Sequence, residues 1–107
     1  MTEYIVVLTT VGSAGEGDKI ARALVEERLA ACVNQVKGIG SIYRWEGRVE
    51  RAEEELLIVK SRRDLFDRLK QRIEQLHSYS VPEIIALPIV AGSENYLRWL
   101  EDELAKS

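Results

Sequence analysis

Residues 32–61 read CVNQVKGIGSIYRWEGRVERAEEELLIVKS, and this stretch decides the fold. It holds two long runs rich in β-branched and aromatic residues, 32–45 and 48–61, which predict two strands. Glu46-Gly47 between the runs has the composition of a two-residue hairpin turn. Gly38 and Gly40 predict a bulge or bend midway along the hairpin.

Two shorter strands and three helices are predicted around this hairpin. Residues 4–9 predict a strand covered on both faces or nearly so, and residues 84–90 predict another. Pro88 requires an edge position or a bulge in the latter. The helices follow the first strand, the hairpin and the last strand. Their apolar stripes are Ala21, Leu24, Val25 and Leu29; Leu65, Phe66, Leu69, Ile73 and Leu76; and Tyr96, Leu97, Leu100 and Leu104.

Serines precede all three helices. Ser13 with Glu16 and Ser61 with Asp64 have the spacing of a capping box, although Asp18 is a rival start for the first helix. Ser93 is placed to cap the last helix. The resulting β-α-β-β-α-β order, followed by a helix, predicts an α+β ferredoxin-like fold over residues 1–107 as a single domain. Its four-stranded antiparallel sheet should carry helices on one face.

The hairpin is long for a single domain of this size. Strands average about 5–6 residues, and an uncovered two-stranded ribbon is unstable in water. The predicted sheet also has an open face with apolar side chains, which invites aggregation unless other chains cover it. We therefore expect an oligomer of identical chains, with Trp45 and Tyr43 near the hairpin turn at the interface.

Composition narrows the classes of partner. The net charge is −3, and residues 49–55 of the second hairpin strand are acidic and contain no aromatic residue, which disfavours nucleic acid. No segment has the length and hydropathy of a membrane span or signal peptide, and the lone Cys32 favours a reducing, cytoplasmic location. No nucleophile, base and acid are arranged as in an enzyme, so catalysis is not predicted.

Several motifs offer weak candidate sites. The glycine-rich loop at residues 12–18 has Asp18 where a phosphate-binding loop needs lysine. His77, the only histidine, could bind a metal with Glu83 or with groups from a neighbouring subunit, although a histidine bonded to backbone is the more ordinary outcome. Tyr79 and Cys32 are candidates for contact with a small ligand. Residues 53–55 (EEE) should form a solvated patch paired with Arg44, Arg48 and Arg51.

Phrases along the whole chain resemble one family. They are LAACVN at 29–34, YRWEG at 43–47, KS at 60–61, HSY at 77–79, VPEIIAL at 81–87 and YLRWL at 96–100. Together they are similar to the CutA family, the divalent-cation tolerance proteins. The resemblance implies a cytosolic homotrimer with interlocking hairpins, tolerance of copper and other divalent metals, and a likeness in shape to PII signalling proteins.

The chain departs from the pattern of family members that look like copper binders. The resemblance implies a cysteine at the end of the first strand and a His-His pair before the Pro-Glu loop. Here Thr9 holds the cysteine position and Leu76 the first histidine position, so only His77 remains. Because a thiolate and one imidazole are lost, copper affinity by that route should be weak.

Two functions follow from these observations. The first is a trimeric, non-enzymatic metal-response protein that binds divalent cations weakly, with no firmly required cofactor. The alternative is a PII-like regulatory module that binds a small ligand between subunits, with the loops at residues 12–18 and 77–83 as candidates. An enzyme with a composite site between subunits ranks last.

Overall fold

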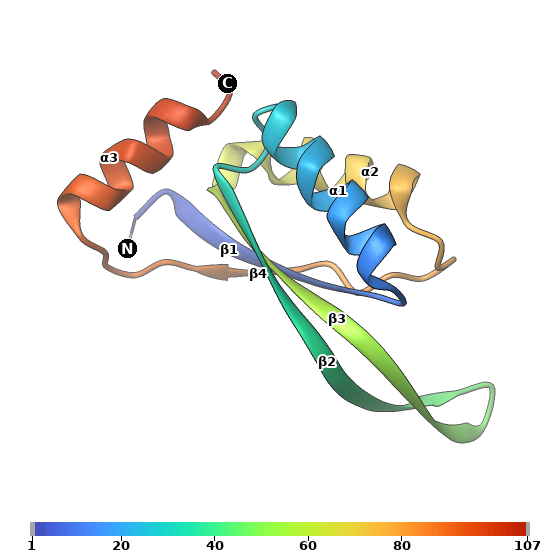
Figure 1. The fold of residues 1–107 in the computed structure, drawn as a ribbon. Coiled ribbons are helices and arrows are strands. Elements are labelled where there is room, and N and C mark those ends of the chain that lie inside the picture. The colour runs from blue at the N-terminus through green and yellow to red at the C-terminus, as the bar shows by residue number, and fades with distance from the viewer. Residues whose placement is uncertain (1, 107) are drawn as a thin grey trace.

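A computed structural model describes residues 2–106 and contains one four-stranded antiparallel sheet with helices on one face (Figure 1). The strands are β1 (Tyr4–Val11), β2 (Cys32–Trp45), β3 (Arg48–Arg62) and β4 (Ile85–Pro88), in the sheet order β2-β3-β1-β4. The helices are α1 (Ala14–Glu26), α2 (Phe66–Leu76) and α3 (Glu94–Glu103), with a short 3-10 turn, η1 (Arg63–Leu65), before α2. The predicted ferredoxin-like α+β fold is confirmed.

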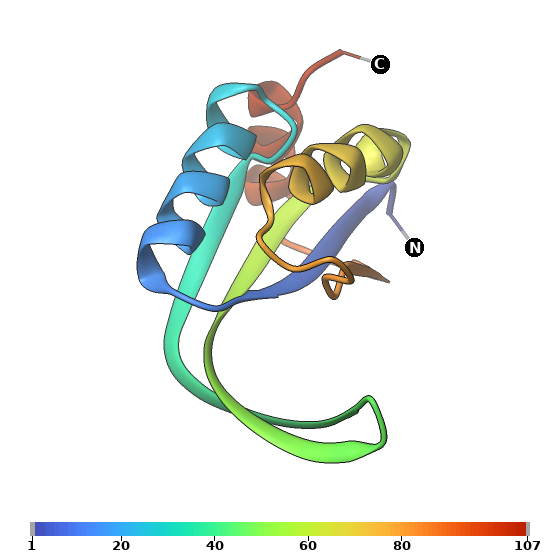
Figure 2. The same ribbon diagram turned by 90° about the vertical axis from the view of Figure 1, so that its right-hand side faces the viewer.

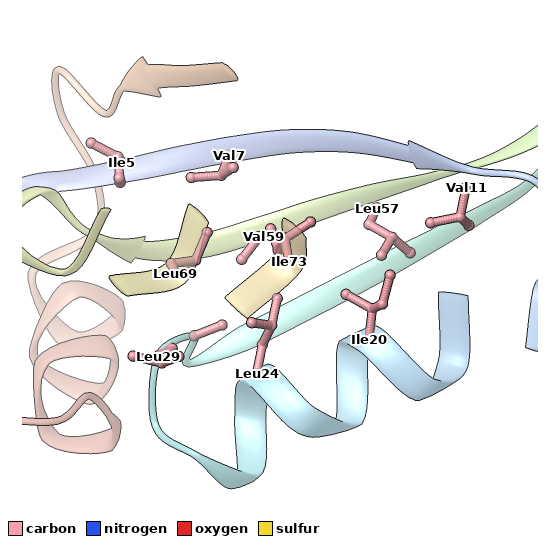
Figure 3. Packing of buried hydrophobic residues seen from close by; sticks show 11 residues of the cluster. Ile5, Val7, Val11, Ile20, Leu24, Leu29, Leu57, Val59, Leu69 and Ile73 are labelled. Carbon is pink, nitrogen blue, oxygen red and sulfur yellow. The ribbon is translucent and has the colours of Figure 1, made fainter. Parts of the chain in front are cut away.

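The core lies between the sheet and the two helices α1 and α2 (Figures 2 and 3). Alternate side chains of β1 and β3 are buried on this face, since successive side chains of a strand point to opposite sides. Ile20 and Leu24 of α1 and Leu69 and Ile73 of α2 are fully buried against them. Within residues 2–106, no helix is both long and apolar enough to cross a membrane.

Two details of the predicted packing were wrong. Val25 is exposed, and Ile20 takes the buried position on α1 because the helix presents residues 17, 20, 21 and 24 to the sheet. Ser61 does not cap a helix: it is buried in β3, and its hydroxyl donates a hydrogen bond to the Leu29 carbonyl at 2.7 Å. β3 runs on to Arg62, so the chain enters the next helix through η1 without a side-chain cap.

The strand predicted to be covered on both faces is covered on one. In β1 the odd-numbered residues from Ile5 to Val11 are buried, whereas Tyr4, Val6, Leu8 and Thr10 are only partly buried on the open face. β4 is an edge strand, as Pro88 requires, and pairs only with β1 among the described strands. One chain therefore leaves the second sheet face open, and among the described strands the two edge strands, β2 and β4, each lack a partner on one side.

The hairpin β2–β3 extends beyond the helical layer and curls (Figures 1 and 2). Its turn residues Glu46 and Gly47 both have positive φ, 50° and 80°, which suits the right-handed twist of a two-residue hairpin. Gly38, with φ 71°, lies where the β2–β3 register shifts between Val36 and Ile39, so the predicted bulge is confirmed. This bend gives the free arm of the hairpin its own direction.

A second small cluster fixes α3 at the far end of the sheet. Leu100 and Leu104 pack with Ala31 and Leu65 in a cluster separate from the main core. Ser93 caps the helix, as predicted, by accepting a hydrogen bond from the Tyr96 amide at 3.3 Å.

A cleft between the hairpin and the loop after α2

His77 begins the loop after α2, and both of its ring nitrogens are bonded to backbone. Nε2 donates to the Thr10 carbonyl at 2.7 Å, and Nδ1 accepts from the Tyr79 amide at 3.0 Å. The imidazole itself is completely buried. The ring therefore fastens the loop to the end of β1, and neither nitrogen is free to bind a metal unless one of these bonds opens.

Glu16 joins the same loop to the start of α1. Its carboxylate accepts hydrogen bonds from the Ser78 amide at 2.7 Å and from the Gly12 amide at 3.4 Å. Burial raises the pKa of Glu16, but these bonds and the nearby His77 outweigh it and hold the pKa below its usual value. The predicted Ser13 cap is present at 3.3 Å, whereas the carboxylate bonds to Gly12 instead of closing the box on Ser13.

Tyr79 connects the loop to the hairpin. Its ring centroid lies 4.7 Å from that of His77, and its hydroxyl donates to Glu54 Oε2 of β3 at 2.7 Å. Burial and the neighbouring carboxylate raise the pKa of Tyr79 to about 12. Gly12 lies close to this ring, since a Cβ at this position would lie 3.1 Å from the Tyr79 hydroxyl oxygen and would require a small shift of the ring.

These contacts shape a cleft of about 660 Å³ between the hairpin and the loop. β2 contributes Ser41, Ile42, Tyr43 and Trp45, and β3 contributes Glu54; Thr10 and residues 79–83 complete the lining. The described lining includes three aromatic side chains and two carboxylates, those of Glu54 and Glu83, but no lysine or arginine. The cleft therefore combines apolar surface with negative charge.

The structure brings together some of the residues singled out by sequence and separates others. Tyr79, Tyr43, Trp45 and Glu83 all line the cleft, whereas His77 supports it from behind. Cys32 is not among the described lining residues; it begins β2, is partly buried, and its thiol lies 3.9 Å from Asn34 Oδ1. The glycine-rich loop contributes through Gly12 and Glu16, as a support for residues 77–79.

Glu54, Thr10 and Ser41 are functional candidates that sequence reasoning missed. Alternation along β3 does put Glu54 on the face opposite Glu55, but only the curl of the hairpin and the Tyr79 bond reveal which face meets the loop. Thr10 contributes a carbonyl to His77 and also lines the cleft.

The prediction that residues 53–55 form one solvated patch is wrong, because the three glutamates lie in different surroundings. Glu53 pairs with Arg51, as predicted, but Glu54 accepts from Tyr79. Glu55 is 3% exposed, because it lies on the helix-covered face beside Gly17, and its Oε1 accepts from the Gln35 amide at 2.8 Å. Burial of Glu55 follows directly from the strand alternation that also buries Leu57 and Val59.

The two positions at which the resemblance implies copper ligands hold core residues here. Thr9 is fully buried, and within residues 2–106 its hydroxyl has no hydrogen-bond partner. Leu76 is partly buried and packs against the main core. Among the described residues no group of three or more His, Cys, Asp or Glu side chains could hold a metal ion. One chain by itself thus does not fit a resident metal centre.

The sheet, the overlong hairpin and the cleft define an α+β domain of the ferredoxin-like class. The family model described as CutA1 divalent ion tolerance protein matches residues 5–103. The chain belongs to this family.

Relatives and solved structures agree with this assignment. The divalent-cation tolerance protein CutA of Thermus thermophilus is 56% identical over 91% of this chain and 94% of its own. The solved structure of the Thermus thermophilus protein has a TM-score of 0.93, and the match covers 95% of this chain and 99% of that one. The crystal structure of CutA1 from Oryza sativa has a TM-score of 0.95 at 47% identity, and the match covers 97% of this chain and 95% of that one. The chloroplastic protein CutA of Arabidopsis thaliana is 51% identical over 92% of this chain, which spans about half (54%) of that relative's length.

Proposed function

We propose that this chain acts in tolerance of divalent cations as a non-enzymatic homotrimer that binds such cations weakly. The observation that carries the proposal is the cleft, whose described lining includes the carboxylates of Glu54 and Glu83 and no lysine or arginine. Membership of a family described by divalent ion tolerance agrees with it. A cytoplasmic location remains part of the proposal and rests on the lone Cys32.

Assembly is supported by the apolar surface that one chain leaves open. On the hairpin, Ile42 is 73% and Val49 65% exposed, and the rings of Tyr43 and Trp45 are close to half exposed. On the edge strand, Ile85 and Leu87 are each 49% exposed. Exposed apolar side chains on the hairpin and on the edge strand β4 favour covering by identical chains, for which closed symmetry is the usual solution.

Weak cation binding follows from the donors that the cleft offers. Glu83 is exposed and makes no hydrogen bond or ion pair within residues 2–106, so its carboxylate is available. His77 can join only if a metal displaces the Tyr79 amide from Nδ1. Copper, which prefers imidazole nitrogen, gains from that exchange, whereas manganese, which prefers carboxylate oxygen, does not.

Calorimetric titration of the full chain with Cu²⁺ and with Mn²⁺ tests this proposal. We expect E83Q to weaken the binding of both ions, and H77A to weaken copper binding alone. E26Q, on an exposed carboxylate of α1, is the matched control and should change neither. Because His77 is buried, circular dichroism must first show that H77A is folded. Equal affinities of wild type and E83Q for both ions would refute the cleft as the cation site.

A second candidate function, a PII-like regulatory module with a small-molecule ligand, is favoured by the size of the cleft. Its volume of about 660 Å³ lies within the ~300–1,000 Å³ typical of small-molecule sites. The hydrogen bonds that His77, Ser78 and Tyr79 donate to Thr10, Glu16 and Glu54 hold one wall in place before any ligand arrives. A thermal-shift screen of nucleotides and metabolites tests this function, and an unchanged melting temperature with every ligand would count against it.

A further inference from the structure

The free arm of the hairpin, residues 39–54, is a two-stranded ribbon that extends away from the rest of the fold (Figure 2). The pairing of β1 with β3 ends at Val11 and Glu55, so among the described strands the two strands of the arm pair only with each other. The arm leaves the sheet at the bulge of β2, where Gly38 has a φ of 71° and a Cβ would meet no other atom within 4 Å. The direction of the arm therefore depends on contacts beyond the backbone ladder.

Two consecutive glutamates of β3 hold the root of the arm from opposite faces of the sheet. Glu55 is buried beside α1 and accepts a hydrogen bond from the Gln35 side chain at 2.8 Å. Glu54 lies on the other face and accepts from the Tyr79 hydroxyl at 2.7 Å. Within residues 2–106, the bond from Tyr79 is the one side-chain hydrogen bond that joins residues 39–54 to the rest of the chain.

Tyr79 is itself held in place, because its loop is bonded to two other elements. The Tyr79 amide donates to His77 Nδ1 at 3.0 Å, and His77 Nε2 donates to the Thr10 carbonyl of β1 at 2.7 Å. The next amide of the loop, that of Ser78, donates to Glu16 of α1 at 2.7 Å. Burial and the neighbouring carboxylate raise the pKa of Tyr79 to about 12, so the phenol keeps its proton at neutral pH and remains a donor.

We propose that Tyr79 is a positioning residue whose hydrogen bond to Glu54, here called the latch, fixes the direction of the arm and presents the arm already oriented to neighbouring copies of the chain. This proposal rests on the proposed assembly of identical chains and names a contact that controls it. The arm carries the exposed side chains of Ile42, Trp45 and Val49. An arm that is free to swing must be ordered when chains associate, whereas a latched arm avoids that cost.

Sedimentation equilibrium of the full chain tests the latch through a double-mutant cycle of Y79F and E54A. If wild type does not dissociate in the measurable range, guanidinium chloride is added equally to all proteins. We expect each substitution to raise the concentration of half-dissociation about tenfold, the factor that corresponds to the loss of one charge-assisted hydrogen bond. The double variant should match the single variants, because all three lack the same bond.

Two further variants serve as controls in the same experiment. E54Q should stay closer to wild type than E54A, because its amide oxygen can still accept from the Tyr79 hydroxyl. E26Q, on an exposed residue of α1 outside the hairpin, should match wild type. Circular dichroism of every variant shows first that the chain is folded.

Energy transfer between two dyes measures the direction of the arm itself. Lys19 of α1 and Glu50 of the arm are exposed, so K19C and E50C can carry the dyes, and C32S removes the one native cysteine. The measurement is made below the concentration of half-dissociation, where the chains are separate. We expect Y79F to broaden the distribution of dye distances, which a loss of stability alone would not do in a folded chain.

The outcomes separate the latch from the proposed assembly. If Y79F and E54A dissociate as wild type does, the latch is overturned and the assembly stands. Additive losses in the double variant would also overturn it, because the two residues would then act separately, for example by direct contact with a neighbouring copy. If wild type is a single chain at micromolar concentration, the proposed assembly fails, and an equally narrow distribution of dye distances in Y79F would then overturn the latch as well.

Discussion

Truncation of Trp45 should weaken the assembly by an amount that follows from its exposure. The side chain is 47% exposed in one chain. An aromatic side chain of this size can bury ~200 Å², so a partner that covers the exposed half removes about 100 Å² from water. At ~25 cal/mol per Å², W45A should cost about 2.5 kcal/mol per subunit, or roughly 70-fold in the affinity of each subunit for the assembly.

Sedimentation equilibrium from nanomolar to micromolar concentration measures this change directly. W45F should fall between wild type and W45A, because it removes less apolar area. E26Q is the control: Glu26 is an exposed residue of α1, outside the hairpin, so its substitution should leave the assembly unchanged. If W45A dissociates over the same concentration range as wild type, Trp45 does not lie at the interface.

Three further predictions concern the folded chain, all measured as free energies of unfolding in urea at one protein concentration. G17A should lower the free energy of unfolding by about 1–3 kcal/mol, because a Cβ at residue 17 collides with the buried Glu55 carboxylate. G15A, on the same helix, places its Cβ where no atom lies within 4 Å, so it should raise the free energy of unfolding by up to about 1 kcal/mol. Effects of equal sign would contradict the contact between residue 17 and Glu55. Q35L should cost about 1–3 kcal/mol by removing the amide that donates to Glu55, and an unchanged stability would show that another group satisfies this carboxylate. The raised pKa of Tyr79 stabilises the folded state while the phenol is protonated, so this stabilisation is complete below pH 10 and is lost as the pH rises towards about 12. Y79F has no phenol to ionise and should therefore lose less stability than wild type between pH 10 and about 12. Identical pH profiles of the two proteins would contradict burial and the hydrogen bond from Tyr79 to Glu54 as the causes of a raised pKa.

Much of the fold could be predicted because short sequence patterns already indicate the turn, the bulge and the edge strand. The hairpin turn at Glu46-Gly47, the bulge at Gly38 and the edge position of β4 each follow from a backbone property of glycine or proline that needs no knowledge of the rest of the molecule. The errors arose where two patterns competed. Ser61 has the spacing of a cap, but the alternation of buried residues along β3 continues through it and carries the strand past the predicted helix start.

The candidate site was harder to predict because it depends on shape. Tyr43, Trp45, Tyr79 and Glu83 could be named from residue type and position. That they share one cleft follows from how far and in which direction the hairpin curls, which the predicted bulge at Gly38 does not by itself fix. His77 was considered as a ligand because it is the only histidine. Which groups meet its two nitrogens depends on the carbonyl of Thr10, about 70 residues earlier in the chain, and is invisible in sequence.

The mass of the particle in solution tests most directly the claim that sister chains must shelter the open sheet face and the free hairpin. Mass photometry or multi-angle light scattering at micromolar concentration should report three times the 12.2 kDa chain mass. A folded particle of one chain mass at that concentration would contradict the account.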